Sequence, residues 1–129
     1  TFLTDQITPS ATSSKIHVNI SVCIKSYYGG ATETNVAGNW TVYRQINGGG
    51  YSNIYPTQTA DVVWQFRGPT NNTPVAWQSL HFVDSPSTTD TVDYKVYSKC
   101  VSADSNFAIG YESSEKKDST IILTEIDGS

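Results

Sequence analysis

The sequence predicts an all-β domain, built as an antiparallel sandwich or barrel. Apolar residues recur with a period of two in several short segments. Clusters of Gly, Pro, Asn, Asp and Ser separate these segments at short spacing. No window favours a helix of useful length. Short strands with turn signals between them are typical of sandwiches and barrels, in which each strand buries one face.

The clearest strand is predicted at residues 16–25. Its even positions are aliphatic, and the positions between them are mostly polar. Because successive side chains of a strand point to opposite faces, the aliphatic set should line the core. That set is Ile16, Val18, Ile20, Val22 and Ile24, and it alternates with His17, Asn19, Ser21, Cys23 and Lys25.

The remaining strands follow from the same alternation. We expect them at residues 40–45, 62–67, 75–83, 92–101, 107–111 and 120–126. The triple glycine at residues 48–50 has strand-like flanks and predicts a hairpin turn or loop. Residues 84–91 are nearly all small or turn-forming, with Pro86 fixing φ among them, and they predict a turn between two strands.

Length and composition indicate one domain covering residues 1–129, without a linker or an internal repeat. Charged residues make up only 16 %, and Thr, Ser, Asn, Gly and Tyr are abundant, which is typical of extracellular or virion β-proteins. The net charge is −4 and no basic run occurs, so binding to nucleic acid is not expected. No segment has the length of a transmembrane helix, so membrane insertion is not expected either.

Motifs for catalysis or metal binding are weak. No G-x-S-x-G nucleophile elbow occurs, and His17 and His81 read as exposed or packed strand residues. The carboxylates of Asp84, Asp90 and Asp93 are candidates for a pair of catalytic acids or for a calcium site. The simpler interpretation is that Asp84 and Asp90 cap turns. We therefore predict no enzyme, no catalytic residue, no metal and no cofactor.

The two cysteines, Cys23 and Cys100, both fall in predicted strands. They could face one another across neighbouring strands, but two separate buried thiols are the preferred interpretation.

The aromatic residues give the main candidates for binding. Tyrosines beside Gly, Ser and Asn in loops provide rigid contact area together with hydrogen-bonding groups. Two such groups stand beside glycine runs, one at the end of the first strand and one after the triple glycine. The predicted receptor-binding residues are Tyr27, Tyr28, Tyr51, Asn53 and Tyr55. The tryptophans Trp40, Trp64 and Trp77 lie in predicted strands, which favours core or interface packing.

Two parts of the chain resemble a known family. Residues 7–16 read ITPSATSSKI, and residues 82–126 contain FVDSPSTT, then YKV, then STIILTEI at the end. These segments resemble the β-sandwich heads of bacteriophage tail fibres and related virion proteins. The resemblance is firm at residues 7–24 and 82–126, and the middle, from residue 27 to residue 74, has no match. It implies a jelly roll of the C1q/tumour-necrosis-factor type that assembles as a homotrimer.

One predicted strand also allows a trimer, because large apolar side chains occupy both of its faces: Val75, Trp77 and Val83 on one, Leu80 and Phe82 on the other. A sandwich covers one face, and a closed cyclic trimer would cover the second.

The expected function is therefore host-receptor recognition by a virion fibre head. Its ligand would be a surface glycan or an outer-membrane component, and its other partners would be virion proteins. One alternative is a structural role as a trimerisation cap, head fibre or capsid-decoration protein. Another is a cellular lectin-like module of the C1q type.

Overall fold

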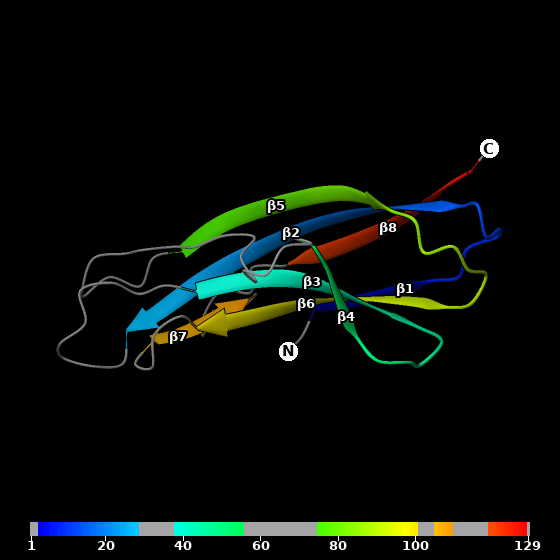
Figure 1. The fold of residues 1–129 in the computed structure, drawn as a ribbon. Helices are drawn as coiled ribbons and strands as arrows, with labels where there is room; N and C mark the ends of the chain where they lie inside the picture. Colours follow the sequence, from blue (N-terminus) through cyan, green and yellow to red (C-terminus); the bar gives the residue numbers. More distant parts are fainter. Residues whose placement is uncertain (1–2, 29–37, 56–74, 101–104, 110–118, 129) are drawn as a thin grey trace.

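The protein folds into two antiparallel β-sheets that pack face to face (Figure 1). The structure, a computed structural model, describes residues 3–28, 38–55, 75–100, 105–109 and 119–128. Within these residues every regular element is a strand. The strands are β1 (Leu3–Ile7), β2 (Lys15–Tyr28), β3 (Gly38–Ile46), β4 (Ser52–Tyr55), β5 (Val75–Asp84), β6 (Val92–Cys100), β7 (Ser105–Ile109) and β8 (Thr120–Ile126).

The first sheet, called sheet A below, has the strand order β1-β6-β3-β4. The second, sheet B, is organised around the long strand β2. Strand β5 pairs along one edge of β2, while β8 and β7 share the other edge end to end. At the junction between β8 and β7, the side chain of Ser119 accepts a 3.0 Å hydrogen bond from the backbone N–H of Cys23. The Ser119 hydroxyl thus satisfies a backbone N–H at the point where the ladder of backbone hydrogen bonds is interrupted.

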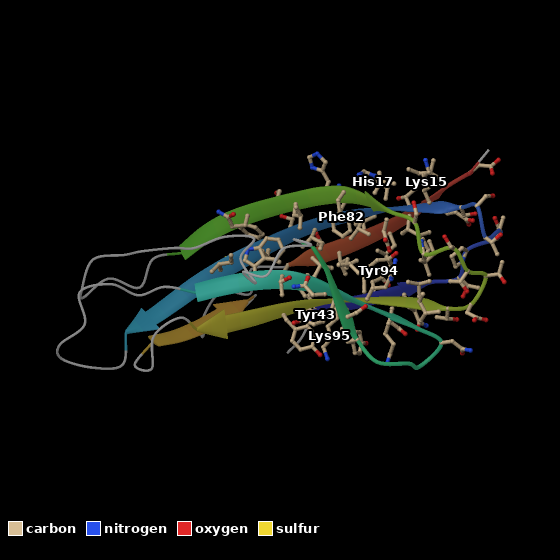
Figure 2. All side chains as sticks on the ribbon, viewed as in Figure 1. Lys15, His17, Tyr43, Phe82, Tyr94 and Lys95 are labelled. Carbon is tan, nitrogen blue, oxygen red and sulfur yellow. The ribbon has the colours of Figure 1, made fainter. Side chains whose placement is uncertain are left out.

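The core lies between the two sheets and is formed by the predicted alternation. Sheet B contributes every second residue of β2, and sheet A contributes the inward residues of β3 and β6. The buried residues that form this core cluster are Ile16, Val18, Ile20, Val22, Ile24, Trp40, Val42, Val92, Tyr94 and Val96. Burial of each aliphatic side chain contributes about 1.5–3 kcal/mol, so this double layer is the main source of stability. Figure 2 shows Phe82 and Tyr94 between the layers.

The hairpin between β3 and β4 is built on an Asn-Gly turn. Asn47 and Gly48 have φ angles of 48° and 71°, and the N–H of Gly49 donates a 3.0 Å hydrogen bond to the carbonyl of Ile46. Two consecutive residues with positive φ match the right-handed twist of the flanking strands, and Asn-Gly is the preferred pair. The glycine run therefore forms the predicted hairpin turn.

The all-β antiparallel sandwich is confirmed. The turn predicted at residues 84–91 is confirmed for residues 85–91, because Asp84 is the last residue of β5 and β6 begins at Val92. Two strands are additional to the prediction, β1 and β4. The strand predicted at residues 62–67, together with Trp64, lies outside the described residues. The jelly-roll connectivity and the trimer stay predictions.

Candidate functional site

A cluster of tyrosines covers the outer face of sheet A. On β3, Trp40 and Val42 point into the core, so Tyr43 faces outward. On β6, the buried Tyr94 and Val96 alternate with outward residues in the same way. The outward side chains Tyr43, Tyr97 and Lys95, together with Tyr51 just before β4, are called the tyrosine patch. Figure 2 shows Tyr43 and Lys95 on this outer side.

Strand register brings the patch together. Tyr43 stands opposite Lys95, and Thr41 stands opposite Tyr97. The ring centroids of Tyr43 and Tyr97 lie 4.6 Å apart, and those of Tyr51 and Tyr97 lie 6.3 Å apart in an edge-to-face arrangement. Both separations fall within the range at which aromatic pairs attract one another. All three side chains are half-buried, so the rings pack against one another and still present part of their surface to solvent.

Lys95 gives the patch its charge. Its ammonium nitrogen lies 5.3 Å from the centre of the Tyr51 ring and 4.9 Å from that of Tyr97. A cation at these distances is attracted by the negative face of an aromatic ring. The rings therefore orient the ammonium group, which keeps N–H donors beside an aromatic surface.

A polar pair borders the tyrosine patch. The hydroxyl of Thr41 donates a 3.0 Å hydrogen bond to Oδ1 of Asn53, which fixes the orientation of the Asn53 amide. Asn53 itself stands opposite Tyr43, next to a register shift at which β4 carries one extra residue, Ile54. Proteins commonly bind amphipathic ligands such as sugars with a combination of aromatic rings, a cation and amide groups.

The structure assembles part of the predicted site. Tyr51 belongs to the tyrosine patch and Asn53 borders it. Tyr27 and Tyr28 lie in β2 opposite residues of β7, and Tyr55 lies in β4 opposite Val42. The side chains of these three tyrosines are outside the described residues. Tyr27 and Tyr28 lie at the end of the long strand β2, as predicted. The predicted loop setting is wrong for Asn53 and Tyr55, because β4 spans Ser52–Tyr55.

The sequence interpretation missed Tyr43, Tyr97 and Lys95. Alternation alone places them on outward faces, opposite to the core residues of their strands. What alternation does not reveal is that β3 pairs with β6, and only that pairing gathers the three side chains into one surface.

The aspartates around the turn do not gather into a site. Asp84 points between the sheets, where its carboxylate binds Arg44 and accepts a 2.8 Å hydrogen bond from the hydroxyl of Tyr94. Its predicted role as a turn cap is therefore replaced by a link between sheets. At Asp90 the backbone N–H donates a hydrogen bond to Oγ1 of Thr88 within the turn. Within the described residues, no three His, Cys, Asp or Glu side chains form a group suited to a metal ion.

The cysteines belong to different sheets, because Cys23 is in β2 and Cys100 is in β6. They therefore do not face one another across neighbouring strands. Cys23 is buried, as predicted, and the side chain of Cys100 lies outside the described residues.

The tryptophans divide between core and surface. Trp40 is in the core, as predicted, whereas Trp77 is 53 % exposed, so core packing is wrong for it and an interface role stays a prediction.

Comparison with known proteins gives no lead on function. No family model, no curated protein and no solved structure matches this chain. None of the described segments is a helix long and apolar enough to cross a membrane.

Proposed function

We propose that this chain is the head domain of a virion fibre, and that it binds a host-cell surface receptor during viral adsorption. The receptor would be a glycan or an outer-membrane component, and the domain would stand on the outside of the virion. The tyrosine patch carries this proposal. Three ordered rings and an oriented ammonium group on one sheet face supply both stacking surface and hydrogen-bond donors. The resemblance of the two ends of the chain to phage fibre heads supports the same role.

Assembly as a homotrimer is part of the proposal. The outer face of sheet B carries large apolar side chains that the monomer leaves exposed, among them Trp77 and Val83. The opposite face of the same strand packs Leu80 and Phe82 against the core. A strand with apolar groups on both faces needs a second cover, which other copies of the chain would supply.

The exposed apolar face also favours a second candidate function, a structural trimerisation cap of a head fibre or capsid decoration. Such a cap needs the assembly face but has no need of the tyrosine patch. A cellular lectin-like module of the C1q type would need the patch but no virion. The three functions therefore differ in what the protein binds.

Binding of labelled protein to candidate host cells and to arrayed glycans tests the proposal. We expect wild-type protein to bind, and Tyr97→Ala to weaken binding at least about tenfold, the usual effect of losing a central aromatic anchor. Tyr97→Phe keeps the ring and should bind nearly as well as wild type.

The charge of the patch is tested with a matched pair of variants. Lys95→Gln should weaken binding, because it removes the ammonium group above the two rings. Lys15→Gln makes the same change at an exposed lysine of sheet B and should leave binding intact. If the wild-type protein binds neither cells nor glycans but binds its own virion, the receptor-binding function is rejected in favour of the structural cap.

A further inference from the structure

The two histidines of the chain lie on the outer face of sheet B, one on each of two neighbouring strands. His17 belongs to β2, the central strand of the sheet, and His81 belongs to β5 beside it. Both alternate with side chains that pack inwards, Val18 on β2 and Phe82 on β5, so both imidazoles face away from the core. Figure 2 shows His17 on this outward side.

Strand register brings the two imidazoles together. His17 stands opposite Val83 and His81 stands opposite Asn19, so the histidines are diagonal neighbours across the pair of strands, within reach of one another. The ring centroids are 6.3 Å apart, and the ring planes make an angle of 78°. The pairing of β2 with β5 runs from Ile16 to Lys25 without a register shift, which fixes both backbones before any ligand binds.

The separation of the rings is compatible with one metal ion between them. A histidine nitrogen binds zinc at about 2.0–2.1 Å, which puts the ion roughly 3.2 Å from the centre of the ring. Two rings on one ion can therefore have centroids as far apart as about 6.4 Å. The observed 6.3 Å lies at the upper end of that range, and rotation of the exposed His81 side chain brings the rings closer.

The type of donor selects the kind of ion. Neutral imidazole nitrogens suit zinc, nickel and copper, whereas calcium and magnesium require several oxygen ligands. Within the described residues, no third His, Cys, Asp or Glu side chain joins the pair. Asn19 adds an exposed amide on the same face, two residues from His17 and opposite His81. The other positions of an ion held here would be taken by water.

We propose that His17 and His81 bind one divalent late transition-metal ion, of the zinc, nickel or copper class, on the outer face of sheet B. The open positions of the ion point away from the sheet, towards whatever covers this face in an assembly. The net charge of −4 attracts cations to the molecule, while Lys15, two residues before His17 on the same face, opposes them locally (Figure 2). Receptor binding by the tyrosine patch on sheet A does not depend on this site.

Calorimetric titration of the full chain with Ni²⁺ tests the proposal. We expect one ion per chain and a thermal midpoint that rises with added Ni²⁺, because an ion that binds the folded state stabilises it. His17→Gln and His81→Gln should each weaken binding at least about tenfold, since losing a ligand costs no less than losing a group that orients one. Lys15→Gln removes the neighbouring positive charge and should strengthen binding. Circular dichroism checks that each variant is folded.

A matched pair of double variants tests the geometry, because each keeps two histidines. His81→Gln/Val83→His puts the second imidazole directly opposite His17 and should restore binding. His81→Gln/Ser79→His moves it the other way along β5, opposite Ser21, and should not. In the wild type, Zn²⁺ should shift the NMR signals of both imidazole rings together.

Several results would overturn the site. One is a wild type that takes up no Ni²⁺, and another is uptake that survives both single variants. A loss of binding in only one single variant would show that one histidine acts alone, which overturns the pair. Equal affinities of the two double variants would overturn the geometry. Binding to cells and glycans is measured on metal-free protein, so the proposed function stands or falls separately.

Discussion

Tyr94 and Asp84 connect the two sheets of the sandwich, since the Tyr94 hydroxyl in β6 donates a 2.8 Å hydrogen bond to Oδ2 of Asp84 at the end of β5. Arg44 of β3 completes the group, with Nη1 2.8 Å from each carboxylate oxygen. The side chains of Arg44 and Asp84 are only 22 % and 13 % exposed. A carboxylate with two partners in such a setting leaves both unpaired when it is removed.

Asp84→Asn should therefore lower the free energy of unfolding by about 2 kcal/mol, below the full cost of breaking a completely buried ion pair because this one is partly solvated. Urea denaturation measures the change. Asp90→Asn makes the same substitution at an exposed position of the following turn and should cost no more than about 0.5 kcal/mol. Equal unfolding midpoints for the two variants would contradict the inter-sheet role of Asp84.

The Tyr94 hydroxyl should make the protein sensitive to alkali. Burial raises the pKa of Tyr94 well above its usual value, and the hydrogen bond to Asp84 raises it further. Because the folded state holds this proton more tightly than the unfolded state, the associated stability is complete below the unfolded pKa of about 10 and is lost as pH rises above it. Unfolding free energies measured between pH 8 and pH 11.5 should fall more steeply in wild type than in Tyr94→Phe.

Tyr94→Phe keeps the buried ring and loses only the hydroxyl. At pH 7 we expect a cost of about 1 kcal/mol, the net value of one hydrogen bond. Identical alkaline slopes for wild type and Tyr94→Phe would show that other groups govern the alkaline transition.

Glu125 of β8 fastens the turn that leads from β1 into β2. Its Oε1 accepts 2.7 Å and 2.6 Å hydrogen bonds from the backbone N–H and the hydroxyl of Ser10. Hydrogen bonds from the Ser10 side chain, and then from Ser14, hold the pKa of Glu125 below its usual value. This stabilisation is present above the unfolded pKa, about 4.3, and is lost as pH falls through the lower folded pKa.

Glu125→Gln should accordingly lower the thermal midpoint at pH 7, and its deficit relative to wild type should shrink towards pH 3. Asp127→Asn removes a nearby exposed charge and serves as the control, with no such pH-dependent deficit. A deficit that is constant from pH 7 to pH 3 would contradict the charge-assisted clamp.

The hairpin after β3 offers a test of backbone conformation with a built-in control. Gly48→Ala should destabilise the protein by about 1 kcal/mol, because a φ of 71° is strained for a residue with a Cβ atom. Space is not the cause, since a Cβ at Gly48 would meet nothing within 4 Å. Gly50→Ala has the same open surroundings without a positive φ in the left-handed range, so it should be neutral or slightly stabilising. Thermal denaturation of the two variants checks the difference.

Local periodicity was sufficient for much of the fold. The alternation from Ile16 to Ile24 identified β2 and its buried face, because a period of two is itself the geometry of a half-buried strand. The polar run after Asp84 identified the turn into β6 for a similar reason. Strands β1 and β4 were not predicted, because neither LTDQI nor SNIY alternates apolar and polar residues. The stretch Leu3–Ile7 has only its two ends partly buried, and its pairing with β6 depends on backbone groups that any residue carries.

What the sequence by itself determined was the class of the protein: a single all-β chain whose apolar residues mark its strands and its core. The tertiary structure decided which strands are neighbours. The choice of neighbours in turn decided which side chains meet in the tyrosine patch and between the sheets. Tyr43 meets Tyr97 because β3 pairs with β6, and Asp84 meets Tyr94 because the end of β5 lies over β6. The physical reason is that periodicity is a property of neighbouring residues, whereas strand pairing joins residues far apart in the chain through hydrogen bonds common to all of them.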